Sequence, residues 1–170
     1  MTIYHGDQAL AERITAQMTH HYMADQVVQG TYAKGAGDTF RGCFIGCIAH
    51  SDNVAEVERL TGLPPTLTRI AESIFEGLPA DEARQFFADM RDCMARNIGK
   101  DVSLVPWQFL HNTVKRALDR PESGTVREAC QPALDVLSAK ARGEVISTQA
   151  AADAAADAAA NAAADAADAA

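Results

Sequence analysis

The chain has 170 residues and a formal net charge of −8 at pH 7. A mildly acidic protein has no general attraction for nucleic acid or anionic lipid, so we expect partners of neither kind. No apolar run approaches the roughly 18 residues of a membrane span, and residues 1–10 lack the residue order of a secretion signal. We therefore expect a cytoplasmic protein whose four cysteines are free thiols.

Nearly every segment has apolar residues at helical spacing, and no alternating pattern of useful length predicts a strand. The prediction is an all-α fold, with about six to seven helices in one compact domain over residues 1–146. Residues 147–170 form an alanine- and aspartate-rich tail. This tail is also predicted to be helical, because alanine favours helix strongly.

Glycine and proline mark the expected ends of the helices, since glycine suits a helix C-terminus and proline suits a first turn. The predicted helices run, in chain order, over Asp7–Gln29, Cys43–Ile48, Asn53–Thr61, from Pro65 to Gly77, from Pro79 to Gly99, from Ser103 to just before Pro121, and from Thr125 to Gly143.

Short polar side chains before several of these helices predict N-terminal caps. Ser51 or Asp52 is expected to cap the third helix, and Ser103 the sixth. The last helix has the clearest start, because Thr125 and Glu128 form a capping box in which each side chain satisfies a free backbone N–H.

The tail repeats Ala-Ala-Ala-Asp at four-residue steps. This spacing places its polar residues within an arc of roughly 120° and leaves a bare alanine face. Such a face can pack closely on another helix of this chain or of a second copy, so the sequence predicts a homo-oligomer. The alternative is a solvated tail that contributes only solubility.

Residues 31–42 break the helical pattern with a glycine-rich loop directly before a short helix. Free N–H groups and the positive end of a helix dipole can hold a phosphate or carboxylate at such a place, and aromatic rings can accept a base. The predicted ligand is therefore an anionic, nucleotide-like small molecule, and the alternative is a plain surface connection. The predicted ligand-binding residues are Tyr32, Lys34, Gly35, Gly37, Phe40, Arg41, Gly42 and Trp107.

A metal site is a further hypothesis for the short helix. Cys43, Cys47 and His50 stand at i, i+4 and i+7, so on a continuous helix they point the same way and could bind zinc. A fourth ligand would have to come from a distant residue such as His20, His21 or Cys93. The structural alternative is a strip of small residues that lets a second helix approach closely, with the cysteines buried as small apolar side chains. This alternative is favoured, and no cofactor is predicted.

No assembled catalytic set is visible in the sequence, so the chain is not predicted to be an enzyme. Ser51 and Asp52 follow His50, but neighbours in sequence point apart on a helix. Glu72 and Glu76 lie one helical turn apart, which is typical of a solvated face and only occasionally of a functional carboxylate pair.

Four short motifs follow one another in the first half of the chain: Gln29-Gly30, Gly42-Cys43-Phe44-Ile45-Gly46-Cys47, Leu60-Thr61-Gly62-Leu63-Pro64 and Ile74-Phe75-Glu76-Gly77-Leu78-Pro79. Their order resembles a family of uncharacterised bacterial and phage helical proteins, some of which end in alanine-rich tails. The chain departs from the family pattern in its longer loop, in Arg41 where lysine is usual, and in Thr66 where tryptophan is expected. The resemblance brings no known activity, but it implies that the glycine/cysteine turn is a recurring unit and suggests a binder of a host component.

Three functional hypotheses follow from the sequence. The first is a non-enzymatic, phage-encoded binding protein that holds an anionic, nucleotide-like molecule and sequesters a host defence signal. The second is a protein-interaction or assembly module that acts through the alanine-rich tail. The third is a metal-dependent enzyme that uses Cys43, Cys47 and His50.

Overall fold

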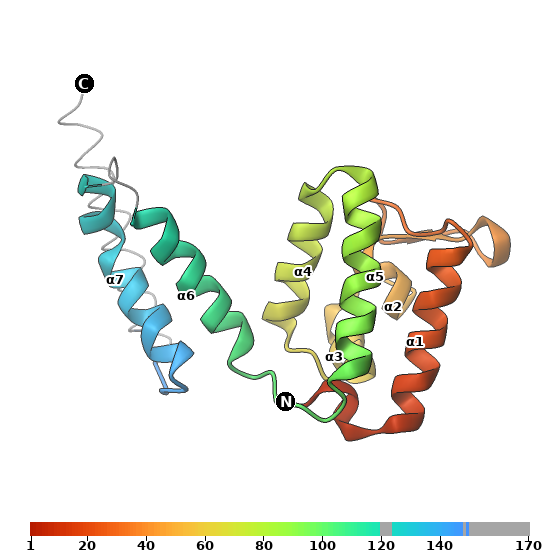
Figure 1. Cartoon of the computed structure of the whole chain (residues 1–170), viewed down its shortest axis with the longest axis horizontal. Helices are drawn as coiled ribbons and strands as arrows, with labels where there is room; N and C mark the ends of the chain where they lie inside the picture. Colours follow the sequence, from red (N-terminus) through yellow and green to blue (C-terminus); the bar gives the residue numbers. More distant parts are fainter. Residues whose placement is uncertain (120–123, 148, 150–170) are drawn as a thin grey trace. The chain divides into compact units, whose positions relative to one another are not determined.

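The computed structural model describes residues 1–119, 124–147 and 149, and the side chains of these residues outside 124–129. The described part is all-α, as predicted, with seven α-helices and one very short antiparallel sheet (Figure 1). The chain divides into two compact units, Met1–Ser103 and Leu104–Ala170. Among the described residues, no helix is long and apolar enough to cross a membrane.

The first unit contains five α-helices, two short 3-10 helices and the two strands. Its elements are, in order, η1 (Ile3–Gly6), α1 (Gln8–Met23), β1 (Ala33–Lys34), η2 (Gly37–Thr39), β2 (Arg41–Gly42), α2 (Phe44–Ala49), α3 (Val54–Thr61), α4 (Pro65–Gly77) and α5 (Ala80–Arg96).

Local sequence signals explain several of these helix ends. The Asp7 carboxylate accepts a hydrogen bond from the Leu10 amide and caps α1. Gly62 ends α3 in the left-handed region, at φ 69°, where glycine avoids the steric penalty of a side chain. The cap of α3 is Asn53, whose side chain accepts from the Ala55 amide, and not Ser51 or Asp52.

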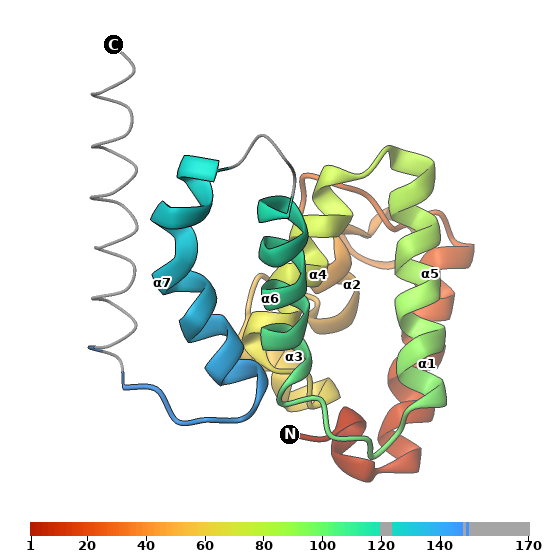
Figure 2. The same cartoon turned by 60° about the vertical axis from the view of Figure 1, so that its left-hand side comes forward.

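The core of the first unit surrounds the short helix α2. Helix α1 packs on α5, and α2 contacts α1, α3 and α4, an arrangement that can be followed in Figure 2. Residues 44–48 are all buried, and the Phe44 ring meets the Phe87 ring edge-on at a centroid separation of 6.1 Å. Every side chain of α2 up to Ile48 therefore contributes to packing, which fixes the segments at both of its ends.

Helix α1 is shorter than predicted. It ends at Met23 instead of Gln29, and Asp25 takes the left-handed conformation with φ 57°. The chain after it runs beside β2, since the Val28 amide donates to the Gly42 carbonyl and the Gly42 amide donates to the Gln26 carbonyl. These bonds to a distant segment replace the last turns of the helix that the local pattern favours.

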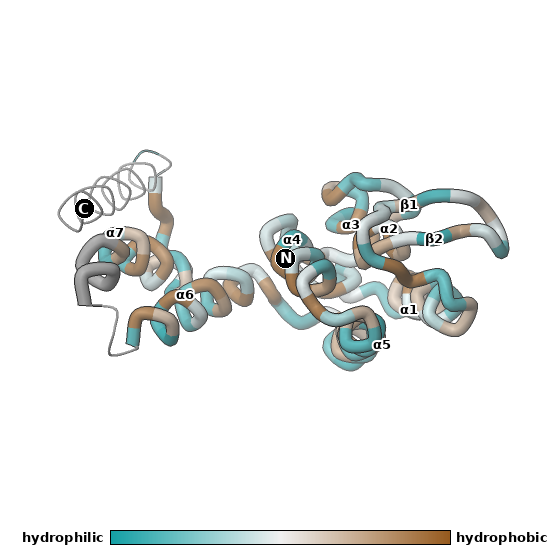
Figure 3. The backbone as a smooth tube through the Cα atoms, turned by 90° about the horizontal axis from the view of Figure 1, so that it is seen from above, coloured by the Kyte–Doolittle hydropathy of each residue, from teal (hydrophilic) through white to brown (hydrophobic). Residues whose placement is uncertain are grey.

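Residues 31–42 form a hairpin that contains the two strands, with Ala33 paired to Gly42 and Lys34 to Arg41. Figure 3 shows β1 and β2 running side by side into this hairpin. The prediction missed the strands because two residues are too few to show an alternating pattern.

The small residues in and just before α2, which include Gly42 and Gly46, do allow a close neighbour, but that neighbour is not a second helix. A Cβ atom added to Gly46 would lie 1.2 Å from the Tyr32 carbonyl oxygen, and one added to Gly42 would lie 2.8 Å from the same atom. The backbone of the loop thus rests directly on α2.

The second unit contains α6 (Val105–Leu118) and α7 (Gly124–Ala141), which pack on each other and lie side by side in Figure 1. The Lys140 ammonium lies over the Trp107 ring, 4.8 Å from its centroid. Ser103 does not cap α6, because its hydroxyl donates to the Asp101 carboxylate.

Several predictions for the C-terminal part lie outside the described residues. The side chains of the Thr125–Glu128 capping box are not described, although α7 begins at Gly124. Residues 148 and 150–170 are not described either. The helical tail, the domain boundary after residue 146 and self-association through the tail therefore stay predictions.

Candidate functional site

A pocket of about 500 Å³ lies in the first unit, between the hairpin and the helices that support it. Its walls come from α1, from the segment that follows α1, from the hairpin and from the end of α2. The lining residues are Gln17, His20, His21, Gln26, Ala33, Gly35, Ala36, Gly37, Phe40 and His50. We call this cavity the histidine pocket.

A chain of hydrogen bonds forms the back of the histidine pocket. The Gln26 amide nitrogen donates to the Gly37 carbonyl at 2.9 Å, and the Gln26 oxygen lies 2.7 Å from His21 Nδ1. His21 Nε2 lies 2.8 Å from His50 Nε2. Gln26 and His21 are 1% and 5% exposed, whereas His50 is exposed. The chain thus leads from a buried amide to an imidazole that solvent can reach.

This geometry assigns the protons when both rings are neutral. Because the Gln26 nitrogen faces a carbonyl, the Gln26 oxygen must be the atom that accepts from His21 Nδ1–H. His21 Nε2 then has no proton and accepts from Nε2–H of His50. The remaining nitrogen of His50, Nδ1, carries a lone pair and can accept a proton or a hydrogen bond from a ligand.

The surroundings of His21 keep it neutral. Burial lowers the pKa of His21, and the nearby His50 and His20 imidazoles lower it further, while the hydrogen bond to Gln26 opposes the shift. The Phe40 ring lies against both His21 and His50, at centroid separations of 4.6 Å and 5.0 Å. The buried end of the hydrogen-bonded chain is therefore uncharged near neutral pH.

The predicted ligand-binding residues fall into several places. Gly35, Gly37 and Phe40 line the histidine pocket. Lys34 is exposed on β1, and the Tyr32 side chain is half exposed.

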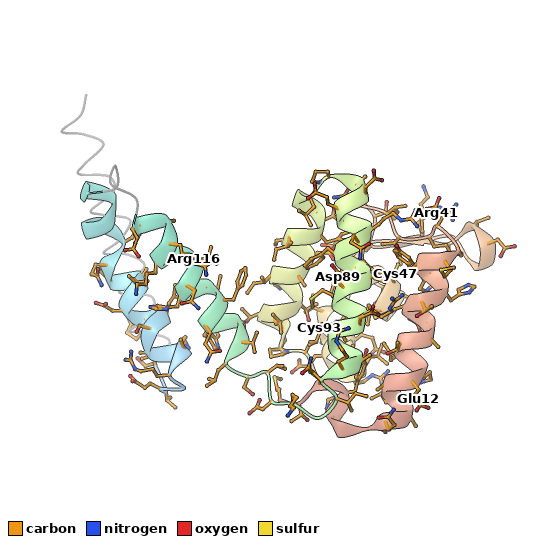
Figure 4. All side chains as sticks on the ribbon, in the orientation of Figure 1. Glu12, Arg41, Cys47, Asp89, Cys93 and Arg116 are labelled. Atoms are coloured by element: carbon orange, nitrogen blue, oxygen red, sulfur yellow. The ribbon has the colours of Figure 1, made fainter. Side chains whose placement is uncertain are left out.

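Arg41 lies on the hairpin, where Figure 4 labels it. Its guanidinium donates back to two loop carbonyls, those of Asp38 and Phe40. Gly42 is buried, and its carbonyl accepts from the Val28 amide. Trp107 belongs to the second unit, where its ring faces Lys140.

The start of α2, where the sequence predicts an anion, already holds a carboxylate of the protein itself. The Ile45 amide donates to Glu72 Oε2 at 3.1 Å, and the Cys43 amide donates to the Thr31 carbonyl. An anion from solution would have to displace Glu72 to reach this amide. The geometry therefore favours the histidine pocket over the glycine/cysteine turn as the place for a ligand.

Cys43, Cys47 and His50 do not converge on one centre. Helix α2 begins only at Phe44, so Cys43 precedes it as the N-cap and His50 follows it as the C-cap. The Cys47 thiol donates to the Gly42 carbonyl at 3.2 Å, and Figure 4 shows Cys47 among the helices of the first unit. His50 Nε2 faces His21.

A different set of metal-ligating atoms does converge. Within the described residues, Cys43, Glu72 and Glu76 are the one group of three such side chains whose ligand atoms all lie within 4.8 Å of one another. A cavity of about 220 Å³ is lined by these three residues and by Gly30, Thr31 and Tyr32. We call this group the thiol–carboxylate cluster.

Burial shapes the ionisation of this cluster. It raises the pKa of the Cys43 thiol to about 12, and the neighbouring Glu72 carboxylate adds to the shift. Burial also raises the pKa of Glu72 itself, and the negative charge of Glu76 raises it further, while hydrogen bonds from the Cys43 thiol and the Ile45 amide oppose the shift. The pKa of Cys47 is raised by burial as well. Both cysteines are thiols near neutral pH.

Sequence reasoning left three important residues outside the proposed site: His21, Gln26 and Glu72. Helical spacing gives Glu72 and Glu76 a common face but does not say what that face meets. Gln26 was placed inside a helix, so its side chain could not be assigned to the loop. The sequence pointed to His21 only as a distant candidate metal ligand, together with His20, and it gave no signal that His21 meets His50.

The described residues define an all-α protein whose first unit contains a histidine-lined pocket and a separate thiol–carboxylate cluster. No protein-family model matches the chain, and no curated protein or solved structure is significantly similar to it.

Proposed function

We propose that the protein binds an anionic, nucleotide-like small molecule in the histidine pocket. The observation that carries this proposal is the hydrogen-bonded chain from Gln26 through His21 to His50, which ends at an exposed imidazole in a pocket of about 500 Å³. Pockets for small ligands typically measure about 300 to 1,000 Å³ and have a mostly apolar lining with a few polar groups.

The polar groups of the pocket suit a negatively charged ligand. When His50 is protonated it offers Nδ1–H to an anion while Nε2–H stays bound to neutral His21. His20 lines the same pocket, and Lys34 precedes Gly35 at the edge of the hairpin. An anion in the pocket can therefore be met by imidazole N–H groups without burying a permanent charge.

The glycine residues of the loop expose their backbone to the pocket. Gly35 and Gly37 line the pocket at φ 80° and 53°, so their backbone is presented to the ligand without a side chain in between. Phe40 supplies an apolar ring in the same wall. The exposed backbone can meet the charged part of a ligand, and the ring can meet a flat part.

In its more specific form, the proposal is that the protein sequesters a nucleotide signal in the cytoplasm of a host cell. Two features support it: the chain resembles phage proteins without a known activity, and the described site combines ligand-sized space with no assembled nucleophile. In this role, tight binding alone would remove the signal from its receptor.

A thermal-shift screen tests the proposal. The full chain is melted with nucleoside mono-, di- and triphosphates, with cyclic nucleotides and with inorganic phosphate. A ligand that binds only the folded form at about 100 times its Kd stabilises that form by about 2.7 kcal/mol, which raises the melting temperature by several degrees.

Two variants locate the binding site. His50→Asn removes the imidazole, and asparagine tolerates the left-handed backbone of His50, with φ 53°. This variant should fold normally and lose the ligand-induced shift. His111→Ala, on α6 of the second unit, is the matched control and should keep it. The proposal fails if no anion raises the melting temperature, or if the His50→Asn chain shifts as far as the parent chain.

A further inference from the structure

The thiol–carboxylate cluster brings together three side chains from two separate parts of the chain. Glu72 and Glu76 lie four residues apart on α4, so their carboxylates share one face of that helix. Cys43 comes from the N-cap of α2, which packs on α4. The sulfur and the two carboxylate oxygens lie within 4.8 Å of one another.

The backbone holds both carboxylates in place. The Ile45 amide donates to Glu72 Oε2, and the Gly30 amide donates to Glu76 at 2.9 Å from Oε2 and 3.2 Å from Oε1. Carboxylates that ligate a metal are commonly fixed in this way by a hydrogen bond from outside the metal's own ligands. Each side chain keeps lone pairs for a further partner, since a carboxylate has about four acceptor sites.

The cysteine is the buried member of the cluster. The Cys43 side chain is 1% exposed and lines the cavity of about 220 Å³ that also contains both carboxylates. Its thiol hydrogen-bonds to the Glu72 carboxylate, and its other contact to an acceptor is long, 3.9 Å from the Tyr32 carbonyl oxygen. The thiol and the carboxylate thus meet beside a space that is larger than one water molecule, about 30 Å³.

Within the described residues, neither Glu72 nor Glu76 forms an ion pair with a lysine or arginine. Glu72 is partly buried, and a buried charge is normally paired. A cation is the missing partner on electrostatic grounds. Because one donor is sulfur, the cation is a borderline-soft metal and not magnesium or calcium, which prefer oxygen ligands only.

We propose that Cys43, Glu72 and Glu76 bind a zinc ion. Zinc accepts one thiolate and two carboxylates in tetrahedral geometry, and three protein ligands leave the fourth position for water. On binding, the Cys43 S–H bond breaks, the sulfur forms a bond to Zn²⁺, and the proton is released to solvent. The ion would join α2, α4 and the segment at Gly30 and so stabilise the fold. This site is separate from the histidine pocket, and its test does not depend on the proposed ligand.

Cobalt(II) is the test ion, because a cobalt–thiolate bond gives a charge-transfer absorption in the near ultraviolet that oxygen ligands do not give. The purified full chain is treated with a chelator, dialysed and titrated with Co²⁺ and then with Zn²⁺. We expect the band to saturate at one cobalt per chain and to disappear when zinc is added, since zinc competes for the same ligands.

Variants then identify the ligands. Cys43→Ser should abolish the band, whereas Cys93→Ser, at an exposed cysteine of α5, should keep it. Glu76→Gln lies at an exposed side chain and keeps one oxygen for the Gly30 amide, so the metal-free chain should still fold, while its zinc affinity should weaken at least about tenfold. This variant keeps the proposal testable if Cys43→Ser does not fold.

Any of three results would overturn the proposal. The first is a parent chain without any thiolate band at saturating cobalt. The second is a band that persists in Cys43→Ser, and the third is a zinc affinity that is unchanged in Glu76→Gln; either of these two would place the metal at other residues.

Discussion

Gly46 provides the sharpest test of the packing between the loop and α2. An alanine side chain there would lie 1.2 Å from the Tyr32 carbonyl oxygen and 2.3 Å from its carbon, whereas ordinary contact begins at about 3.4 Å. Gly46→Ala therefore requires the loop backbone to move by about 2 Å. Helix propensity alone predicts that Gly46→Ala stabilises the protein, because alanine in a helix is favoured over glycine by about 1 kcal/mol.

The magnitude follows from what that movement breaks. The displaced segment carries the 2.7 Å hydrogen bond from the Cys43 amide to the Thr31 carbonyl and the pairing between β1 and β2. Each lost hydrogen bond costs about 1 kcal/mol, and overpacking a core costs about 1 to 3 kcal/mol. We expect Gly46→Ala to lower the free energy of unfolding by about 3 kcal/mol.

Urea denaturation followed by circular dichroism measures this change. Gly77→Ala is the matched control, because Gly77 is also a helical glycine and a Cβ atom there would meet nothing within 4 Å. The control should be neutral or slightly stabilising. A Gly46→Ala chain as stable as the parent chain would refute the close approach of the loop to α2.

Three further predictions concern other parts of the first unit. The pKa of His21 lies below its usual 6.5, so the unfolded chain binds a proton at this residue more readily than the folded chain does. The free energy of unfolding should therefore fall as pH drops below about 6.5, by at most about 1.4 kcal/mol per pH unit. His21→Phe should flatten that dependence in pH-resolved urea denaturation, and an unchanged slope would exclude His21 as its source. Asn53→Ala should cost about 1 kcal/mol in the same assay through loss of the α3 cap, and no loss would mean that the cap is not formed. A thiol reagent followed by peptide mass mapping should modify exposed Cys93 well before buried Cys43, whose pKa of about 12 leaves almost no thiolate at pH 8; equal rates would contradict the burial of Cys43.

Local chemistry made much of the fold predictable from the sequence. The third helix stops at Gly62, and the fourth follows the Pro64-Pro65 pair and ends at Gly77, as predicted, because glycine and proline act through their own backbone preferences. The all-α class was also predictable, since apolar spacing reports the period of the backbone directly. Part of the candidate site could be found in the same way, because Gly35, Gly37 and Phe40 lie in a loop that the helical pattern excludes.

The tertiary structure decided where that loop and its neighbours meet. Helix α1 stops at Met23 because the next residues bond to Gly42, and His21 reaches His50 across 29 positions of sequence. Glu72 accepts a hydrogen bond from the Ile45 amide at the start of α2, 27 positions away in sequence, which no local pattern could indicate. Backbone preference is a property of neighbouring residues, so the sequence alone determined the helices and their ends. The pocket and the thiol–carboxylate cluster depend on contacts between distant segments, and only packing in three dimensions selects those contacts.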